Sequence, residues 1–330
     1  MSDVLLSVRD LKVSFFTPAG EVKAVGGISY DLKRGEVMGI VGESGSGKSV
    51  EAYSIMGLLQ SPGRVTGGSI LLDGEDVLAY DNDKLREMRG NRVSMIFQNP
   101  MTSLNPVYTI GNQIREALLA HQKLPKEEAN KRAVEMLEWV GINHPEKRIR
   151  QYPHELSGGM RQRVMIALAL ITGPDLLIAD EPTTALDVTI QAQILELMKR
   201  IQREAKMAII FITHNLGVVA DICHRVSVMY AGLIVETGGV DEIFYNPKHP
   251  YTQGLLRSMP RVDEEVYEKL IPIAGTPVDM LNPPPGCPFA PRCEHCMKIC
   301  MRAFPPTTTV NDGHLVNCWL AQRGEINAVS

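Results

Sequence analysis

A glycine-rich segment at residues 42–49 limits what this chain can fold into more than any other part of it. The segment reads Gly-Glu-Ser-Gly-Ser-Gly-Lys-Ser and matches the pattern G-x-x-x-x-G-K-S/T of a phosphate-binding P-loop. An apolar run at residues 36–41 precedes it and predicts a strand, and residues 50–59 predict a helix. The sequence therefore predicts an α/β protein of the P-loop nucleoside-triphosphatase class, rather than a glycine-rich turn that binds nothing.

Each fixed position of this segment has a chemical reason. Glycines let the backbone wrap a phosphate with its N–H groups turned inward, and the N-terminus of the following helix adds partial positive charge. Lys48 is expected to reach the β- and γ-phosphates, and the hydroxyl of Ser49 is expected to bind Mg²⁺. The residues predicted to bind ATP here are Gly42, Ser44, Gly45, Ser46, Gly47, Lys48 and Ser49.

Composition excludes several other classes of protein. The net charge of −4 argues against a general nucleic-acid-binding surface. No apolar run approaches the roughly 18–20 residues that a membrane span needs. The N-terminal residues 1–4 lack the basic segment and apolar stretch of a signal peptide. We therefore expect a cytosolic protein, which could still dock on a membrane protein.

The pattern of apolar residues predicts the organisation of the chain. Alternating segments at residues 4–8, 11–15 and 28–32 predict an antiparallel β layer, and helical spacing over 110–140 predicts a helical insertion at about 99–160. Continuous apolar runs at 176–179 and 208–212 are typical of parallel strands buried on both faces. Prolines and cysteines become dense beyond about 245. We therefore expect an ATPase domain at 1–245 and a separate, loop-rich extension at 246–330.

Two carboxylates follow the apolar run Leu176–Ala179 in the manner of a Walker B strand. Asp180 is expected to hold Mg²⁺, and Glu181 to polarise the water that attacks the γ-phosphate. The structural alternative is that Asp-Glu after a strand marks a helix N-terminus. The P-loop upstream favours the catalytic interpretation.

A second glycine pair precedes the Walker B strand. Ser157-Gly158-Gly159 opens a predicted helix, and few P-loop proteins carry such a segment as well. The segment resembles the signature motif of ATP-binding cassette (ABC) ATPases, which implies a RecA-like core. The resemblance implies that these three residues touch the γ-phosphate held by a second cassette, and Met160 stands where the family usually has Gln.

Other residues occur in the order that the ABC family shows. The resemblance implies that Gln98 is the Q-loop glutamine, which contacts Mg²⁺ and water, and that Asp187 ends the D-loop at residues 185–187. His214 resembles the switch histidine that contacts the γ-phosphate, and it is followed by Asn215 where the family often has Asp. The aromatic residues expected to stack on adenine are Phe15 and, as a reserve, Phe16.

Two segments narrow the resemblance to the ATPases of dipeptide and oligopeptide importers: residues 97–106 and the His-Pro-Tyr segment at 246–252. Membership implies an ATP-hydrolysing subunit at the cytoplasmic face of the cell membrane. The implied partners are a second ABC ATPase, identical or related, two transmembrane permeases and an extracytoplasmic peptide-binding protein, with no nucleic acid. Nickel or an oligosaccharide is an alternative cargo. A soluble ABC ATPase of DNA repair or translation is disfavoured, because the chain has no long coiled-coil insert.

Five of the six cysteines lie between Cys287 and Cys318. In a reducing cytosol such a cluster favours metal binding over disulfides, and four thiolates suit zinc or an iron–sulfur cluster. The family resemblance maps a [4Fe–4S] site onto Cys287, Cys293, Cys300 and Cys318, with zinc as the alternative and Cys296 as an extra thiol. Because this tail lies outside the cassette motifs, we expect ATP binding to be independent of the cluster.

Overall fold

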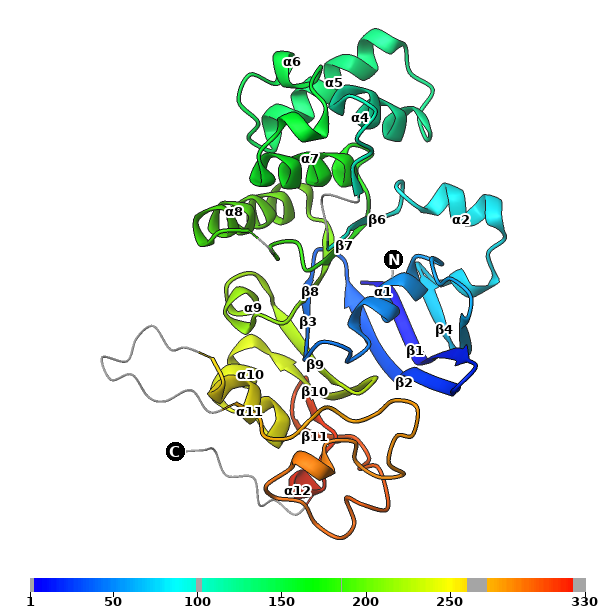
Figure 1. Ribbon diagram of the computed structural model, residues 1–330, viewed down its shortest axis with the longest axis vertical. Coiled ribbons are helices and arrows are strands. Elements are labelled where there is room, and N and C mark those ends of the chain that lie inside the picture. The colour runs from blue at the N-terminus through cyan, green and yellow to red at the C-terminus, as the bar shows by residue number, and fades with distance from the viewer. Residues whose placement is uncertain (1–2, 99–102, 185, 260–271, 323–330) are drawn as a thin grey trace, which may run out of the picture. The chain divides into compact units, whose positions relative to one another are not determined.

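The computed structural model describes residues 3–98, 103–184, 186–259 and 272–322. The chain divides into two compact units, and each is described by itself. The first comprises residues 1–32, 37–78 and 212–330, and the second comprises residues 33–36 and 79–211. The elements of both units are labelled in Figure 1.

The first unit contains the predicted antiparallel layer. Its strands are ordered β2-β1-β4-β5, with bounds Val4–Thr17 for β1, Gly20–Lys33 for β2, Gly63–Leu72 for β4 and Glu75–Asp76 for β5. The two strands predicted at 4–8 and 11–15 are in fact one. The register against β4 shifts between Arg9 and Lys12, and Asp10 has φ 44°. The strand is therefore continuous but irregular at this point, and the sequence prediction divided it there.

A second run of strands in this unit carries the P-loop. Its order is β11-β12-β10-β9-β3, with bounds Thr308–Asn311, His314–Val316, Leu233–Gly239, Arg225–Tyr230 and Val37–Val41. Strand β3 is buried throughout and pairs in parallel with β9, while β9 and β10 pair antiparallel as a hairpin. The helices of this unit are α1 (Lys48–Ile55), α9 (Leu216–Ile222), α10 (Val240–Tyr245), α11 (Pro250–Arg257), the 3₁₀ turn η3 (Ala290–Arg292) and α12 (Trp319–Gln322).

Part of the C-terminal region packs into a buried cluster of the first unit. Tyr251, Phe289 and Cys300 belong to the same buried cluster as Val228 and Tyr230 of β9. The ring centroids of Tyr230, Tyr251 and Phe289 lie 4.6–5.3 Å apart. These contacts join residues far apart in the sequence, and isolated apolar residues among prolines show no periodicity that would reveal them. The domain boundary near residue 245 stays a prediction.

The buried side chain of Glu236 on β10 connects this C-terminal region to β10 through hydrogen bonds. Its buried carboxylate accepts the backbone N–H groups of Lys248 at 2.6 Å and His249 at 3.0 Å, and it lies 2.8 Å from Nε2 of His314. Burial lowers the pKa of His249 to about 4, so that ring is neutral at physiological pH. One carboxylate therefore joins β10, the start of α11 and β12.

The second unit contains the strand run β8-β7-β6 and the predicted helical insertion. Strand β7 (Leu176–Asp180) pairs in parallel with β6 (Val93–Ile96), and β8 (Ala208–Thr213) belongs to this unit through Phe211. The helices are α2 (Asn82–Met88), α4 (Ile110–Leu119), α5 (Lys126–Trp139), α6 (Pro145–Arg148), α7 (Gly158–Leu170) and α8 (Val188–Ala205). Helices α4, α5, α6 and α7 gather at one end of this unit (Figure 1). Within the described ranges, no helix combines the length and apolarity that crossing a membrane requires.

One buried acidic pair gives the first unit a titratable core. Tyr30 of β2 donates a hydrogen bond to Glu51 of α1, and Glu51 is 1% exposed. Burial raises the pKa of Glu51 to about 7, partly opposed by the hydrogen bond from Tyr30. The carboxyl therefore binds a proton more tightly in the folded chain than in the unfolded chain.

This pair predicts a pH dependence of stability. The raised pKa stabilises the folded state fully below the ordinary glutamate pKa, and the stabilisation is lost as pH rises through about 7, an effect of up to about 3 kcal/mol. Glu51→Gln should remove this component from the free energy of unfolding, measured by urea denaturation from pH 5 to 8. The exposed Glu21→Gln is the control and should retain the wild-type profile. If both variants retain that profile, Glu51 does not titrate in this range.

Candidate functional site

The P-loop occupies a space that only glycine can fill at two positions. A Cβ atom added at Gly42 would lie 2.1 Å from the carbonyl oxygen of Met229, and one added at Gly47 would lie 2.4 Å from that of Ala24. Gly47 also has φ 100°, while Gly45 has φ 79° with open space around it. The loop is thus set between β2 and the end of β9, and the glycines of the motif have a steric cause.

Lys48 lies within the loop that precedes it. Its side chain is buried, and Nζ donates to the carbonyl oxygens of Gly42 at 2.8 Å and Glu43 at 2.9 Å and to Oγ of Ser46 at 3.3 Å. Lys48 and Ser49 are also the first two residues of α1, which begins at Gly47 as its N-cap. A cation and a helix N-terminus therefore meet at one loop, which is an arrangement suited to phosphate.

Sequence reasoning missed the role of Glu43, because the P-loop pattern leaves that position variable. Its backbone N–H donates to the hydroxyl of Tyr251 at 2.9 Å, and its carboxylate pairs with Arg292 at 2.6 and 2.9 Å. The hydrogen bond to Glu43 raises the pKa of Arg292, so the guanidinium is always charged. No local sequence signal joins residues that are 249 positions apart.

The remaining predicted residues of the first unit lie at element ends. Phe15 is half-buried near the end of β1 with its ring against Gly63, and Phe16 is 39% exposed with the Arg64 guanidinium carbon 4.0 Å from its ring centroid. His214 is exposed directly after β8. Asn215, where the family often has Asp, caps α9 by accepting the N–H of Gly217 at 3.0 Å. Asn performs that capping as well as Asp does.

The second unit brings together the residues predicted to act on water. Gln98 donates through Nε2 to Oε2 of Glu181 at 2.8 Å, and the hydroxyl of Thr184 donates to the same oxygen at 2.9 Å. Asp180 ends β7 and is 1% exposed. Glu181 has φ 47°, a conformation unusual for a residue other than glycine, and such strain is concentrated at functional sites. Thr184 was not predicted from the sequence.

The signature segment is built as a capped helix N-terminus. Oγ of Ser157 accepts the N–H of Met160 at 3.4 Å, so α7 begins at Gly158. Met160 contributes its backbone to this cap, and its replacement of the family's Gln therefore leaves the cap intact. Gln162 on the buried face of α7 donates to the carbonyl oxygen of Pro182 at 2.6 Å and so ties the signature helix to the segment after Glu181.

The predicted D-loop aspartate also caps a helix. Oδ1 of Asp187 accepts the N–H of Ile190 at 2.9 Å and starts α8, and Ile190 packs where a Cβ on Gly159 would lie 2.8 Å from it. Gly159 is therefore required by the approach of α8. Ala185, the first residue of the predicted D-loop, lies outside the described residues.

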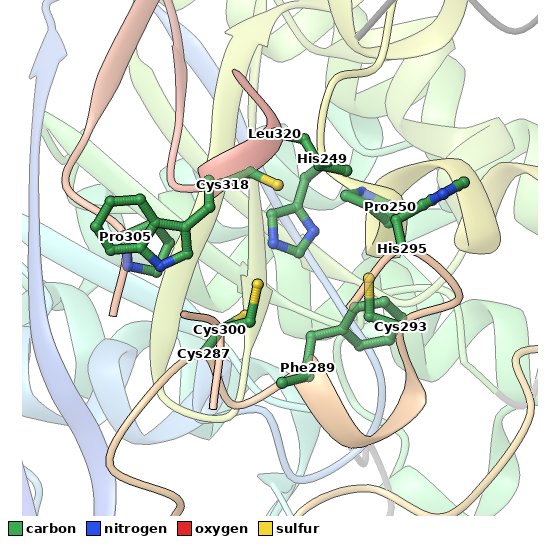
Figure 2. Close-up of a pocket in the computed structure, with 12 residues that line it drawn as sticks. His249, Pro250, Cys287, Phe289, Cys293, His295, Cys300, Pro305, Cys318 and Leu320 are labelled. Atoms are coloured by element: carbon green, nitrogen blue, oxygen red, sulfur yellow. The ribbon is translucent and has the colours of Figure 1, made fainter. Parts of the chain in front are cut away.

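Four cysteines line one small pocket in the first unit. Cys287, Cys293, Cys300 and Cys318 surround it together with His249 and Phe289, and Figure 2 shows the sulfur atoms of Cys293, Cys300 and Cys318 around the His249 ring. All are free thiols, and Cys296 is exposed and outside this lining. Burial raises the pKa of Cys287 to about 12 and that of Cys293 to about 11, so binding a metal there would displace protons.

The arrangement of the described side chains does not by itself indicate a metal site at these thiols. Across the described ranges, no group of three or more His, Cys, Asp or Glu side chains is arranged to hold a metal ion. The four cysteines that line the pocket are the same four that the family resemblance selected, and Cys296 does not line it.

The fold and these motifs together define a P-loop ATPase, and comparisons with known proteins place it more closely. The ABC transporter family model matches residues 25–184, and the model of the oligopeptide/dipeptide transporter C-terminal region matches residues 235–300. The chain is 56% identical to the dipeptide transport ATP-binding protein DppD of Bacillus subtilis, over 98% of this chain and 97% of that protein. It is 57% identical to the oligopeptide transport ATP-binding protein OppD of the same organism, over 96% of this chain and 88% of that protein.

A solved structure agrees with this placement. A dimeric ATP-binding cassette in a post-hydrolysis state, bound to ADP and phosphate, matches with a TM-score of 0.65 and 26% identity over 71% of this chain and 98% of that chain. This chain therefore belongs to the ABC transporter family, in its group of dipeptide and oligopeptide transport ATP-binding proteins.

The close approach of backbone to the P-loop predicts a stability effect at Gly47. Gly47→Ala places a methyl group against the carbonyl of Ala24 at a left-handed backbone position, and we expect a loss of about 2–4 kcal/mol. Gly239→Ala is the control, because a Cβ there meets open space. Thermal unfolding without nucleotide measures both. Equal midpoints for the two variants would show that the loop yields at no cost.

Proposed function

We propose that this chain is the ATP-binding and ATP-hydrolysing subunit that powers a dipeptide or oligopeptide importer. The observation that carries the hydrolytic role is the contact of Gln98 and Thr184 with one oxygen of Glu181, directly after Asp180. The cargo is supported by relatives whose names specify dipeptide and oligopeptide transport and by the match to that family's C-terminal region.

Each proposed residue has a physical task in this reaction. The P-loop amides and Lys48 hold the phosphates, and an aromatic ring at Phe15 or Phe16 covers adenine. Glu181 orients and polarises the attacking water, with Gln98 and Thr184 fixing its carboxylate, while His214 contacts the γ-phosphate. Ser49, Gln98 and Asp180 would hold Mg²⁺, which neutralises phosphate charge when bound.

The proposed assembly contains two cassettes. Ser157, Gly158, Gly159 and Asp187 would then meet the nucleotide bound by the other subunit, identical or related. Capped helix N-termini at Ser157 and Asp187 are suited to this, because their backbone N–H groups favour negative charge. Two permeases and an extracytoplasmic peptide-binding protein would complete a transporter in which this subunit is peripheral, at the cytoplasmic face.

The hydrolytic assignment predicts that Glu181→Gln separates binding from turnover. Affinity for ATP should be retained, because the carboxylate acts on water, while steady-state hydrolysis in the assembled transporter should fall at least about 100-fold. Exposed Glu196→Gln on α8 is the matched control and should hydrolyse normally. Turnover of Glu181→Gln near that of the control would reject the assignment.

The same assay tests the cargo. Binding protein loaded with dipeptide or oligopeptide should stimulate hydrolysis, and binding protein loaded with nickel or oligosaccharide should not. Stimulation by either of those cargoes alone would replace peptide as the substrate class.

We also propose that the cysteine pocket holds an iron–sulfur cluster. The donor set fits, since four free thiols line one space and soft thiolates suit iron–sulfur or zinc. One zinc ion would draw four sulfurs to about 2.3 Å from a single point. Zinc held by the same four thiolates is the alternative, and the iron and zinc contents distinguish the two.

Anaerobic purification tests the cluster. The protein should be brown and contain about four iron atoms per chain. Serine at Cys287, Cys293, Cys300 or Cys318 should bleach it, while Cys296→Ser, outside the pocket, should remain brown. A colourless protein with one zinc per chain would reject the cluster and keep the thiolate site. Bleaching by Cys296→Ser alone would reject the proposed ligands.

A further inference from the structure

Glu43 links the P-loop to the C-terminal region, which lies outside the cassette motifs. Two residues of the C-terminal region contact Glu43. The hydroxyl of Tyr251 accepts its backbone N–H at 2.9 Å, and Arg292 pairs with its carboxylate. Within the loop, the carbonyl oxygen of Glu43 accepts from Nζ of Lys48 at 2.9 Å. A displacement of Glu43 would therefore move a contact of the lysine that is proposed to bind phosphate.

Arg292 is placed as a rigid support. Its side chain is 4% exposed, and its two terminal nitrogens contact the two oxygens of Glu43 in a bidentate pair. Nε donates to the carbonyl oxygen of Ala274 at 3.0 Å, and the guanidinium lies 5.8 Å from the ring centroid of Tyr230 and 5.9 Å from that of Phe289. With its donors used and two aromatic rings beside it, the arginine has little freedom to follow a moving loop.

Arg292 is held in place by the residues that line the cysteine pocket. Arg292 ends the η3 turn and precedes Cys293, and the turn is closed by hydrogen bonds from the N–H of Ala290 to Cys287 and from the N–H of Cys293 to Ala290. Phe289 lines the pocket and packs against Tyr251. The two groups that hold Glu43 are thus both in contact with the pocket lining.

We propose that Arg292 and Tyr251 are positioning residues for nucleotide binding. An intact four-cysteine pocket supports these two residues and through them fixes the conformation of the P-loop. The inference rests on the proposed ATP-binding function. It replaces the expectation, drawn from the sequence, that ATP binding is independent of the C-terminal cysteines. Neither residue touches the nucleotide; both act through Glu43, by keeping the loop preorganised.

The test is the dissociation constant of a fluorescent ATP analogue with Mg²⁺, measured on the full-length chain. Arg292→Gln should weaken binding about tenfold, and Tyr251→Phe should weaken it severalfold, while turnover at saturating ATP in the assembled transporter stays within about twofold. Arg292→Lys should restore only part of the affinity, because an ammonium cannot make the bidentate pair. Exposed Arg302→Gln is the matched control and should bind as the wild type.

A double-mutant cycle separates positioning from general destabilisation. Once Glu43→Gln has removed the carboxylate, adding Arg292→Gln should cause little further loss of affinity. Cys293→Ser should weaken ATP binding in the wild type but cause no further loss in Arg292→Gln, and Cys296→Ser should have no effect in either.

Each contrary outcome has a distinct meaning. Additive losses in the cycle, or affinities within twofold of wild type for both Arg292→Gln and Tyr251→Phe, would overturn the positioning role. Normal affinity in Cys293→Ser would overturn the link to the cysteine pocket. If Arg292→Gln shows no cooperative thermal transition, Tyr251→Phe and Glu43→Gln decide the question with smaller changes. A wild-type chain that binds no ATP would reject the proposed function itself.

Discussion

The approach of two backbone carbonyls to the P-loop is the constraint on which the first unit depends. The oxygens of Met229 and Ala24 lie where side chains at Gly42 and Gly47 would have to be. The loop is consequently fixed between two strands before any ligand is considered, and Lys48 closes it from within. Preorganisation of this kind lets a binding site avoid the entropy cost of ordering its own backbone when the ligand arrives.

Much of this architecture could be predicted from the sequence, because its signals are local. The P-loop glycines, the apolar strands and the helical spacing each occupy a continuous window, and the structure has strands and helices in the corresponding segments. The single strand β1 was misread because the irregularity at Asp10 resembles a turn. The pairing of Glu43 with Arg292 had no local signal at all. Contacts between positions far apart depend on the folded chain, and neither periodicity nor composition encodes them.

Structural and functional readings of the same residue need not compete. A helix cap was the ordinary explanation for the signature segment, and the structure shows that Ser157 is such a cap, as are Asp187 and Asn215. An N-cap starts the helix at a defined residue and leaves the other N–H groups of the first turn without partners inside the helix. A residue that starts a helix at a defined place also fixes the direction of these N–H groups, which the proposed contact with a nucleotide would use.

The buried carboxylate of Glu236 makes the first unit depend on the C-terminal region. Its three partners, the backbone of Lys248, the backbone of His249 and the ring of His314, all follow the residues that form the nucleotide-binding motifs. Cutting the chain after β10 would remove these three hydrogen-bond partners from a buried carboxyl group, which is costly for a polar group out of contact with water. The C-terminal region thus supplies part of the first unit's buried interior. A chain shortened to the cassette motifs would expose that interior to solvent.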